Sequence, residues 1–126
     1  MNKTELKTYI FETYNAVSDF PWERYTEYEV FRQVNNRKMF ALVMNIPRKR
    51  LGLPSEEIID IVNLKCDPLL IGSLRQEPGI FPAYHMNKEH WISVALDGSV
   101  PDEKMKMLLD LSFRLTETKI RRKKPS

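Results

Sequence analysis

The chain has 126 residues, of which 42% are hydrophobic and 29% are charged, and its net charge is +3 at pH 7. This length fits one domain with a core of its own. The apolar runs are too short to cross a bilayer, no apolar signal segment is visible near Met1, and the single cysteine, Cys66, excludes an internal disulfide. We therefore expect a cytoplasmic protein that does not contact membranes.

The positive charge is concentrated at the C-terminal end of the chain. Residues 119–126 hold five of the twenty basic residues and no acidic one, whereas residues 1–118 hold 15 basic and 17 acidic residues. A nucleic-acid interface on this nearly neutral body would need its cations clustered on one face. We expect a single domain over residues 1–120, followed by a basic, disordered tail over residues 121–126.

Apolar periodicity and turn residues predict helices near both ends of the chain and several strands between them. Pro21 ends the first helix, and Asp67 with Pro68 starts a short one. Ser99 is the expected N-cap of the last helix. In chain order, the predicted elements are a helix over 2–16, strands over 28–34, 38–46 and 58–65, a helix over 68–76, an extended piece over 81–85, a strand over 91–96 and a helix that starts after 99.

Each terminal helix presents one apolar stripe. Leu6 and Ile10 belong to the first stripe. The expected buried positions of the last helix are Met105, Leu108, Leu109, Ser112 and Leu115. Short turns between the strands favour antiparallel pairing. The sequence therefore predicts an α+β fold, with a single antiparallel sheet and both terminal helices packed on one of its faces.

Segment 81–91, FPAYHMNKEHW, is the part of the chain richest in side chains with binding chemistry. It holds both histidines, one of the two tryptophans, an asparagine and a lysine. Aromatic rings can stack on bases, and the polar groups can contact phosphates or base edges. The alternative is that the rings belong to the core and the imidazoles are satisfied hydrogen-bond partners. The candidate binding residues of this segment are Tyr84, His85, Asn87, Lys88 and His90.

Two short basic stretches lie in predicted loops. Arg48, Lys49 and Arg50 follow the second strand, and Arg37 and Lys38 lie at the hairpin turn. Two basic hairpin tips are what a wing-type DNA-binding protein would present to phosphates, with affinity from counterion release. The alternative for such a triplet is a solvated loop.

Catalytic and metal sites are not indicated. No base can be placed beside Cys66, so a small buried thiol is the better interpretation. His85 and His90 are two potential metal ligands without a converging third and fourth one. We therefore expect no catalytic residues, no bound metal and no cofactor.

Several motifs closely resemble the MmcQ/YjbR family of small bacterial proteins, in an order and spacing that cover nearly the whole chain. These motifs are KMFA at 38–41, NLKCDP at 63–68, PAYHMNKEHW at 82–91, LDG at 96–98 and PD at 101–102. The resemblance implies a CyaY-like fold and a DNA-binding protein with a double-wing arrangement of hairpins. Iron binding is not carried over from frataxin-type proteins, because Lys3 and Lys7 offset Glu5 and Glu12 in the first helix.

Two functions stay open on the sequence alone. The first is a non-enzymatic DNA-binding protein that contacts phosphates through the basic loop tips and the 84–91 patch. The second is a small-molecule or protein-binding module with a pocket around His85 and His90. We expect a monomer in either case, with DNA as the partner in the first.

Overall fold

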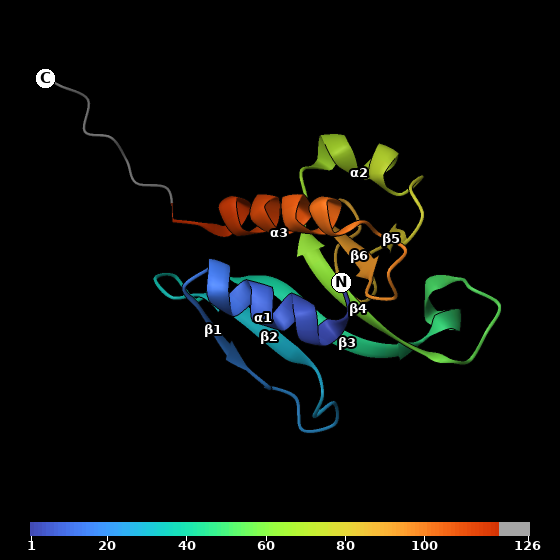
Figure 1. Ribbon diagram of the computed structural model, residues 1–126, viewed down its shortest axis with the longest axis horizontal. Helices are drawn as coiled ribbons and strands as arrows, with labels where there is room; N and C mark the ends of the chain where they lie inside the picture. The colour runs from blue at the N-terminus through green and yellow to red at the C-terminus, as the bar shows by residue number, and fades with distance from the viewer. Residues whose placement is uncertain (119–126) are drawn as a thin grey trace, which may run out of the picture.

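A computed structural model, which describes residues 1–118, shows one antiparallel sheet with helices on one of its faces (Figure 1). The six strands lie in the order β1-β2-β3-β4-β6-β5, and each neighbouring pair is antiparallel. The predicted α+β fold is confirmed. In chain order the elements are α1 (Lys3–Thr13), β1 (Ala16–Asp19), β2 (Glu29–Gln33), β3 (Met39–Pro47), the 3-10 helix η1 (Arg48–Leu51), β4 (Ile58–Lys65), α2 (Pro68–Leu74), β5 (Ile80–Pro82), β6 (Trp91–Ala95) and α3 (Asp102–Thr116).

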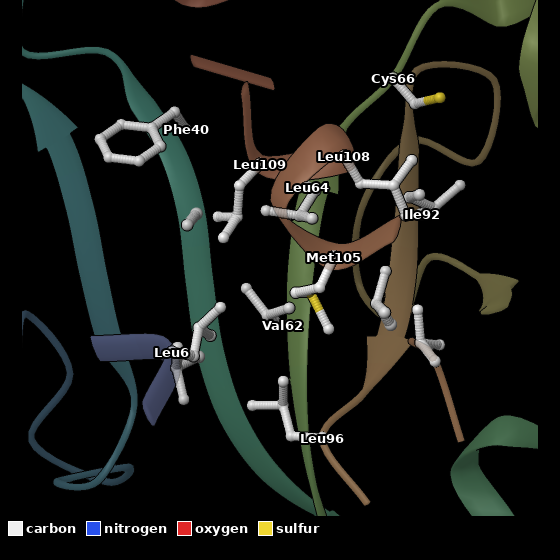
Figure 2. Close-up of a cluster of buried hydrophobic side chains, with 14 of the residues drawn as sticks. Leu6, Phe40, Val62, Leu64, Cys66, Ile92, Leu96, Met105, Leu108 and Leu109 are labelled. Atoms are coloured by element: carbon white, nitrogen blue, oxygen red, sulfur yellow. The ribbon is translucent and has the colours of Figure 1, made fainter. Parts of the chain in front are cut away.

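The face of the sheet that carries the helices, here called the helix face, holds the larger part of the core. Strand residues alternate between the two faces, so Val62 and Leu64 of β4 point to the same side. Leu6 of α1 and Leu109 of α3 are fully buried in the same cluster, as Figure 2 shows. Burial of each such side chain contributes about 1.5–3 kcal/mol. Both terminal helices therefore cover one face, as predicted.

The opposite face, here called the open face, has a second apolar cluster that loops cover. This cluster consists of Val30, Leu42, Met44, Ile46, Ile59, Ile61 and Ala95. The buried apolar residues of α1, α2 and α3 all belong to the helix face. Side chains that pack on the open-face cluster include Tyr28, Leu51 and Tyr84, from loops and from η1. A rigid sheet that carries loop side chains in this way is a common frame for a binding surface.

The first helix is shorter than predicted, and a strand that the sequence did not reveal follows it. Asn2 and Glu5 form a capping box at the start of α1, but the helix ends at Thr13 because Tyr14 is extended. Residues 16–19 then form β1 against β2. A pattern of four residues is too short to identify a strand, so the pairing with β2 decides this conformation.

The last helix differs from its prediction at both ends. Pro101 is the N-cap residue, whereas Ser99 donates to the Asp97 carboxylate through its N–H (3.0 Å) and its hydroxyl (2.6 Å). Leu115 is exposed, and Thr116 is buried in its place. Thr116 follows Ser112 by about one helical turn and donates its hydroxyl to the Ser112 carbonyl, so it lies on the buried stripe.

The other elements lie close to their predicted bounds. The strand predicted over 58–65 has those bounds, and the short helix ends at Leu74 instead of 76. The extended piece predicted over 81–85 is wrong in position, because β5 occupies Ile80–Pro82 and the chain then turns. The predicted tail, residues 121–126, lies outside the described residues.

Candidate functional site

A pair of buried polar residues on the open face anchors the loop that carries the predicted patch. Asn63 of β4 and Ser93 of β6 are cross-strand partners without exposed surface, and the serine hydroxyl donates to the Asn63 side chain. The Tyr84 N–H donates to Ser93 Oγ (2.9 Å), and the Tyr84 carbonyl accepts from Asn63 Nδ2 (2.8 Å). A buried polar group left unpaired costs about 1–3 kcal/mol. These bonds therefore hold the backbone of Tyr84 against the sheet.

His85 follows in a left-handed backbone conformation that few non-glycine residues adopt. Its φ is 56°, a conformation that costs roughly 1–2 kcal/mol in a residue with a Cβ. The imidazole lies beside the Tyr84 ring, with ring centroids 4.0 Å apart, and it is exposed. Residues in such conformations cluster at ligand-binding and catalytic sites. The turn at His85 is therefore a candidate functional position on the open face.

Three aromatic residues from the loop between β1 and β2 complete a hollow beside His85. Trp22, Tyr25 and Tyr28 line it together with Met44 of β3, and its volume is about 280 Å³. Tyr25 and Tyr28 are stacked, with centroids 4.6 Å apart, whereas Trp22 meets Tyr28 edge-on at 6.2 Å. We call this site the aromatic hollow. Its rings and its buried methionine suit a flat, apolar group.

A second hollow of about 440 Å³, here called the polar hollow, adjoins the first along Tyr25 and Tyr28, which line both. Its position follows from the register of the sheet. Glu29, the first residue of β2, pairs with Val43, so residues 45–47 at the end of β3 extend past β2. These residues line the polar hollow together with the loop that precedes β2. The two hollows thus form one continuous surface.

The charged groups of the polar hollow come from separate loops. Arg24 lies in the loop before β2, and Arg50 lies in η1. Glu27 is the acidic residue that lines the hollow, and its carboxylate accepts a hydrogen bond from Asn45. Burial raises the pKa of Tyr28, and the neighbouring phenols raise it further, so this hydroxyl is neutral near pH 7. Two cations therefore face one anion in this hollow.

The structure divides the predicted patch into two parts. Tyr84 lines the polar hollow and His85 lines the aromatic hollow. Asn87, Lys88 and His90 are exposed on the same loop but line neither hollow. The Asn87 side chain accepts from the backbone N–H two residues later (2.8 Å), which makes it an organiser of the turn.

The two predicted basic tips lie at opposite ends of β3. Arg37 and Lys38 precede this strand, and η1 follows it. A strand of nine residues separates the tips by roughly 30 Å. They therefore do not form one compact basic patch.

Two cations of the basic triplet have acidic neighbours. Lys49 Nζ lies 2.9 Å from the Glu56 carboxylate, and Arg48 lies 3.8 Å from the Asp97 carboxylate. Arg50 is the member of the triplet that lines the polar hollow. The triplet is thus split, with one cation directed to the candidate site and two engaged locally.

Cys66 is buried, and burial raises the pKa of its thiol, with a further rise from the Asp67 carboxylate. It is therefore a core residue and a poor nucleophile. Within residues 1–118, no three His, Cys, Asp or Glu side chains are grouped closely enough to hold a metal ion. Over the same range, no helix combines the length and the apolar character needed to cross a membrane.

Trp22, Arg24 and Tyr25 line the two hollows but are absent from the candidate residues that the sequence predicts. Four aromatic residues lie between positions 20 and 28, after the predicted first helix and before the first predicted strand is complete. Trp22 is 40% exposed and Tyr25 is 51% exposed, values that a core role does not explain. The sequence feature that indicates this site is a cluster of aromatic residues around a proline. The segment that holds it lacks helix or strand periodicity.

These features define a small α+β protein whose sheet is covered by helices on one face and carries an aromatic surface on the other. A family model described as YjbR matches residues 11–115, and the chain belongs to the YjbR family. The family predicted from the sequence motifs is therefore confirmed.

Relatives and solved structures agree with this assignment. The chain is 38% identical to the uncharacterised protein YyaQ of Bacillus subtilis over 93% of its length and 99% of that protein. A crystal structure of a Pseudomonas syringae protein matches with a TM-score of 0.90 and 44% identity, over 93% of this chain and all of that one. A Deinococcus radiodurans structure matches with a TM-score of 0.67 and 30% identity, over 90% of this chain and 77% of that one. These likenesses concern family and fold.

Proposed function

We propose that the protein is a non-enzymatic nucleic-acid-binding protein whose contact surface is the open face of the sheet. The observation that carries the proposal is the pair of adjoining hollows, with aromatic rings in one and two arginines in the other. Bases stack on aromatic side chains, and arginine guanidinium groups bind phosphate oxygens. The surface thus has partners for both parts of a nucleotide.

The main contact with nucleic acid would lie at the two hollows and not at the basic loop tips. Tips separated by the length of β3 would reach phosphates far apart on a duplex, and Arg48 and Lys49 already have carboxylate neighbours. An ion pair has to open before its cation can contact a phosphate. Arg50 is retained from the predicted set because it lines the polar hollow together with Arg24.

A small aromatic anion is the second candidate ligand. The volume of the polar hollow, about 440 Å³, lies within the range of small-molecule sites. The pocket predicted around His85 and His90 lay elsewhere, because His85 lines the adjoining aromatic hollow and His90 lines neither hollow. This second candidate would use the same surface and bind a free ligand instead of a strand.

Fluorescence anisotropy with a labelled oligonucleotide at several salt concentrations tests the proposal. The double variant Arg24→Gln, Arg50→Gln should weaken binding about tenfold or more at low salt. The slope of log K against log salt should become shallower by roughly 1.4–1.8, since each lost phosphate contact removes about 0.7–0.9. Lys49→Gln is the matched control, because this neighbouring cation is paired with Glu56 and should leave the affinity nearly unchanged.

Two results would count against the proposal. If the wild-type protein bound no oligonucleotide at low salt, nucleic-acid binding would be excluded. If it bound a free nucleotide but no strand, and the arginine variants abolished that binding, the small-ligand candidate would replace it.

A further inference from the structure

We infer that the aromatic hollow takes one unpaired base of a single-stranded nucleic acid, while the polar hollow takes an adjoining phosphate. The inference rests on the proposed function and adds which form of nucleic acid is recognised. It follows from the division of the surface into an apolar part and a charged part that share a wall of two tyrosines.

The aromatic hollow has the composition of a base-stacking site. Trp22 and His85 enter it from two different loops, and the buried Met44 contributes from the sheet. Both rings are substantially exposed to water without a ligand, so a base that covered them would bury apolar surface on both partners. Stacking on an aromatic side chain typically contributes about fivefold or more in affinity for each base.

The base has to be unpaired. Within a duplex the faces of each base are covered by its neighbours in the stack, and the edges are occupied by pairing. A protruding helix or hairpin can enter the groove of a duplex, but a concave site cannot. A hollow of about 280 Å³ lined by side chains instead receives a base that has left the stack. The preference for single strands therefore follows from the concave shape of the site.

The position of the arginines agrees with a phosphate next to the base. Arg24 and Arg50 line the polar hollow, which shares Tyr25 and Tyr28 with the aromatic hollow. A base and its phosphate are joined through one sugar, so their two sites must be neighbours. Glu27 is the group that opposes an anion here, and its carboxylate accepts a hydrogen bond from the Asn45 side chain.

His85 gives a variant that should fold normally. Its φ of 56° is a conformation that glycine adopts without strain, so His85→Gly should leave the backbone turn intact. Trp22 lies on an exposed loop, and Trp22→Ala should likewise leave the core intact. Phe20→Ala is the matched aromatic control, because Phe20 is 53% exposed on the same loop but lines neither hollow.

The test compares three probes of equal length: a single DNA strand, an abasic strand with the same phosphates, and the matching duplex. The wild-type protein should bind the single strand about fivefold or more tightly than the abasic strand, and more tightly than the duplex. Trp22→Ala and His85→Gly should each reduce this preference for bases and leave the abasic affinity unchanged. Phe20→Ala should change neither, and the arginine double variant should weaken both single-stranded probes.

A direct readout uses the variant Trp91→Phe, in which Trp22 is the one remaining tryptophan. Its fluorescence should change when the single strand binds and stay unchanged with the abasic strand. Equal affinity for intact and abasic strands, or tighter binding of the duplex, would overturn the inference and leave the proposed function standing. Binding of none of the probes at low salt would remove both.

Discussion

Backbone conformation at single residues shapes both the site and its support. His85 adopts a left-handed conformation and lines the aromatic hollow. Gly79 and Gly98 adopt the same left-handed conformation, with φ of 82° and 87°. Gly79 directly precedes β5, and Gly98 lies in the turn that follows β6. The glycines differ in their surroundings, because Gly79 faces Ser99 and Val100 at close range whereas Gly98 faces open space. Alanine substitutions at these two positions therefore distinguish the energetic cost of the backbone conformation from the cost of a steric clash.

Gly79→Ala should be much more destabilising than Gly98→Ala. A Cβ at position 79 would lie 2.3 Å from Ser99 Oγ and 2.7 Å from Val100 Cγ2, so the turn before α3 would have to shift. We expect the free energy of unfolding to fall by about 2–4 kcal/mol for Gly79→Ala. For Gly98→Ala only the conformational cost of about 1–2 kcal/mol applies. Urea unfolding of both variants measures the difference, and equal losses would show that the tight contact is absent.

Among the structural elements, the turn between β6 and α3 contacts the loop between β3 and β4 through an ion pair. Asp97 accepts from the N–H and the hydroxyl of Ser99, and its carboxylate lies 3.8 Å from Arg48 of η1. Burial by itself would raise the pKa of Asp97, but the hydrogen bonds from Ser99 and the charge of Arg48 outweigh it and lower this pKa. The turn thus fixes one end of the segment that carries Arg50.

The lowered pKa predicts how stability depends on pH. A carboxyl group whose pKa is lower in the folded state stabilises the fold above its ordinary pKa of 3.8, and that contribution is lost as the pH falls through the folded value. Asp97→Asn should therefore be less stable than the wild type at pH 7, by about 1 kcal/mol. The difference should shrink below about pH 4.

Thermal unfolding of both proteins between pH 2.5 and 7 measures this effect. Ser99→Ala combined with Asp97→Asn completes a double-mutant cycle, and the two losses should not add because both change the same interaction between the Ser99 hydroxyl and the side chain at position 97. A stability difference that stayed constant down to the lowest pH would contradict a stabilising role for the ionised Asp97 carboxylate.

At the scale of the whole molecule, the uneven distribution of charge controls non-specific attraction. Residues 1–118 are nearly neutral, and residues 119–126 add five cations. Arg24 and Arg50 lie together at the polar hollow, whereas the terminal cations can attract any polyanion. Affinity and selectivity should therefore depend on different parts of the chain.

Truncation after Thr118 should lower the affinity for intact and abasic strands by the same factor. The slope of log K against log salt should become shallower by about 0.7 for each phosphate contact that is lost. The preference for strands with bases should stay the same, because Trp22 and His85 are unchanged. Anisotropy at two salt concentrations measures both quantities, and a selective loss of the base preference would contradict this separation.

Local patterns along the chain predict the fold class and part of the candidate site. Helix stripes, alternating strands and caps such as Asp67 before Pro68 are local patterns, and local patterns predict elements because their period reflects which side is buried. The same applies to Tyr84 and His85, which were singled out by the density of functional side chains around them. The same density of polar groups predicts that His85, Asn87, Lys88 and His90 are exposed, because so many polar side chains are hard to satisfy in a core.

Which of these residues meet depends on how the strands and loops are arranged in space. Trp22 and His85 are far apart in the chain, and they line one hollow because their two loops lie over the same face of the sheet. The basic tips are close in sequence, yet the nine residues of β3 hold them apart. Strand β1 likewise exists through its pairing with β2. Contacts of this kind depend on strand order and register, which bring distant segments together, and no local spacing in the chain records them.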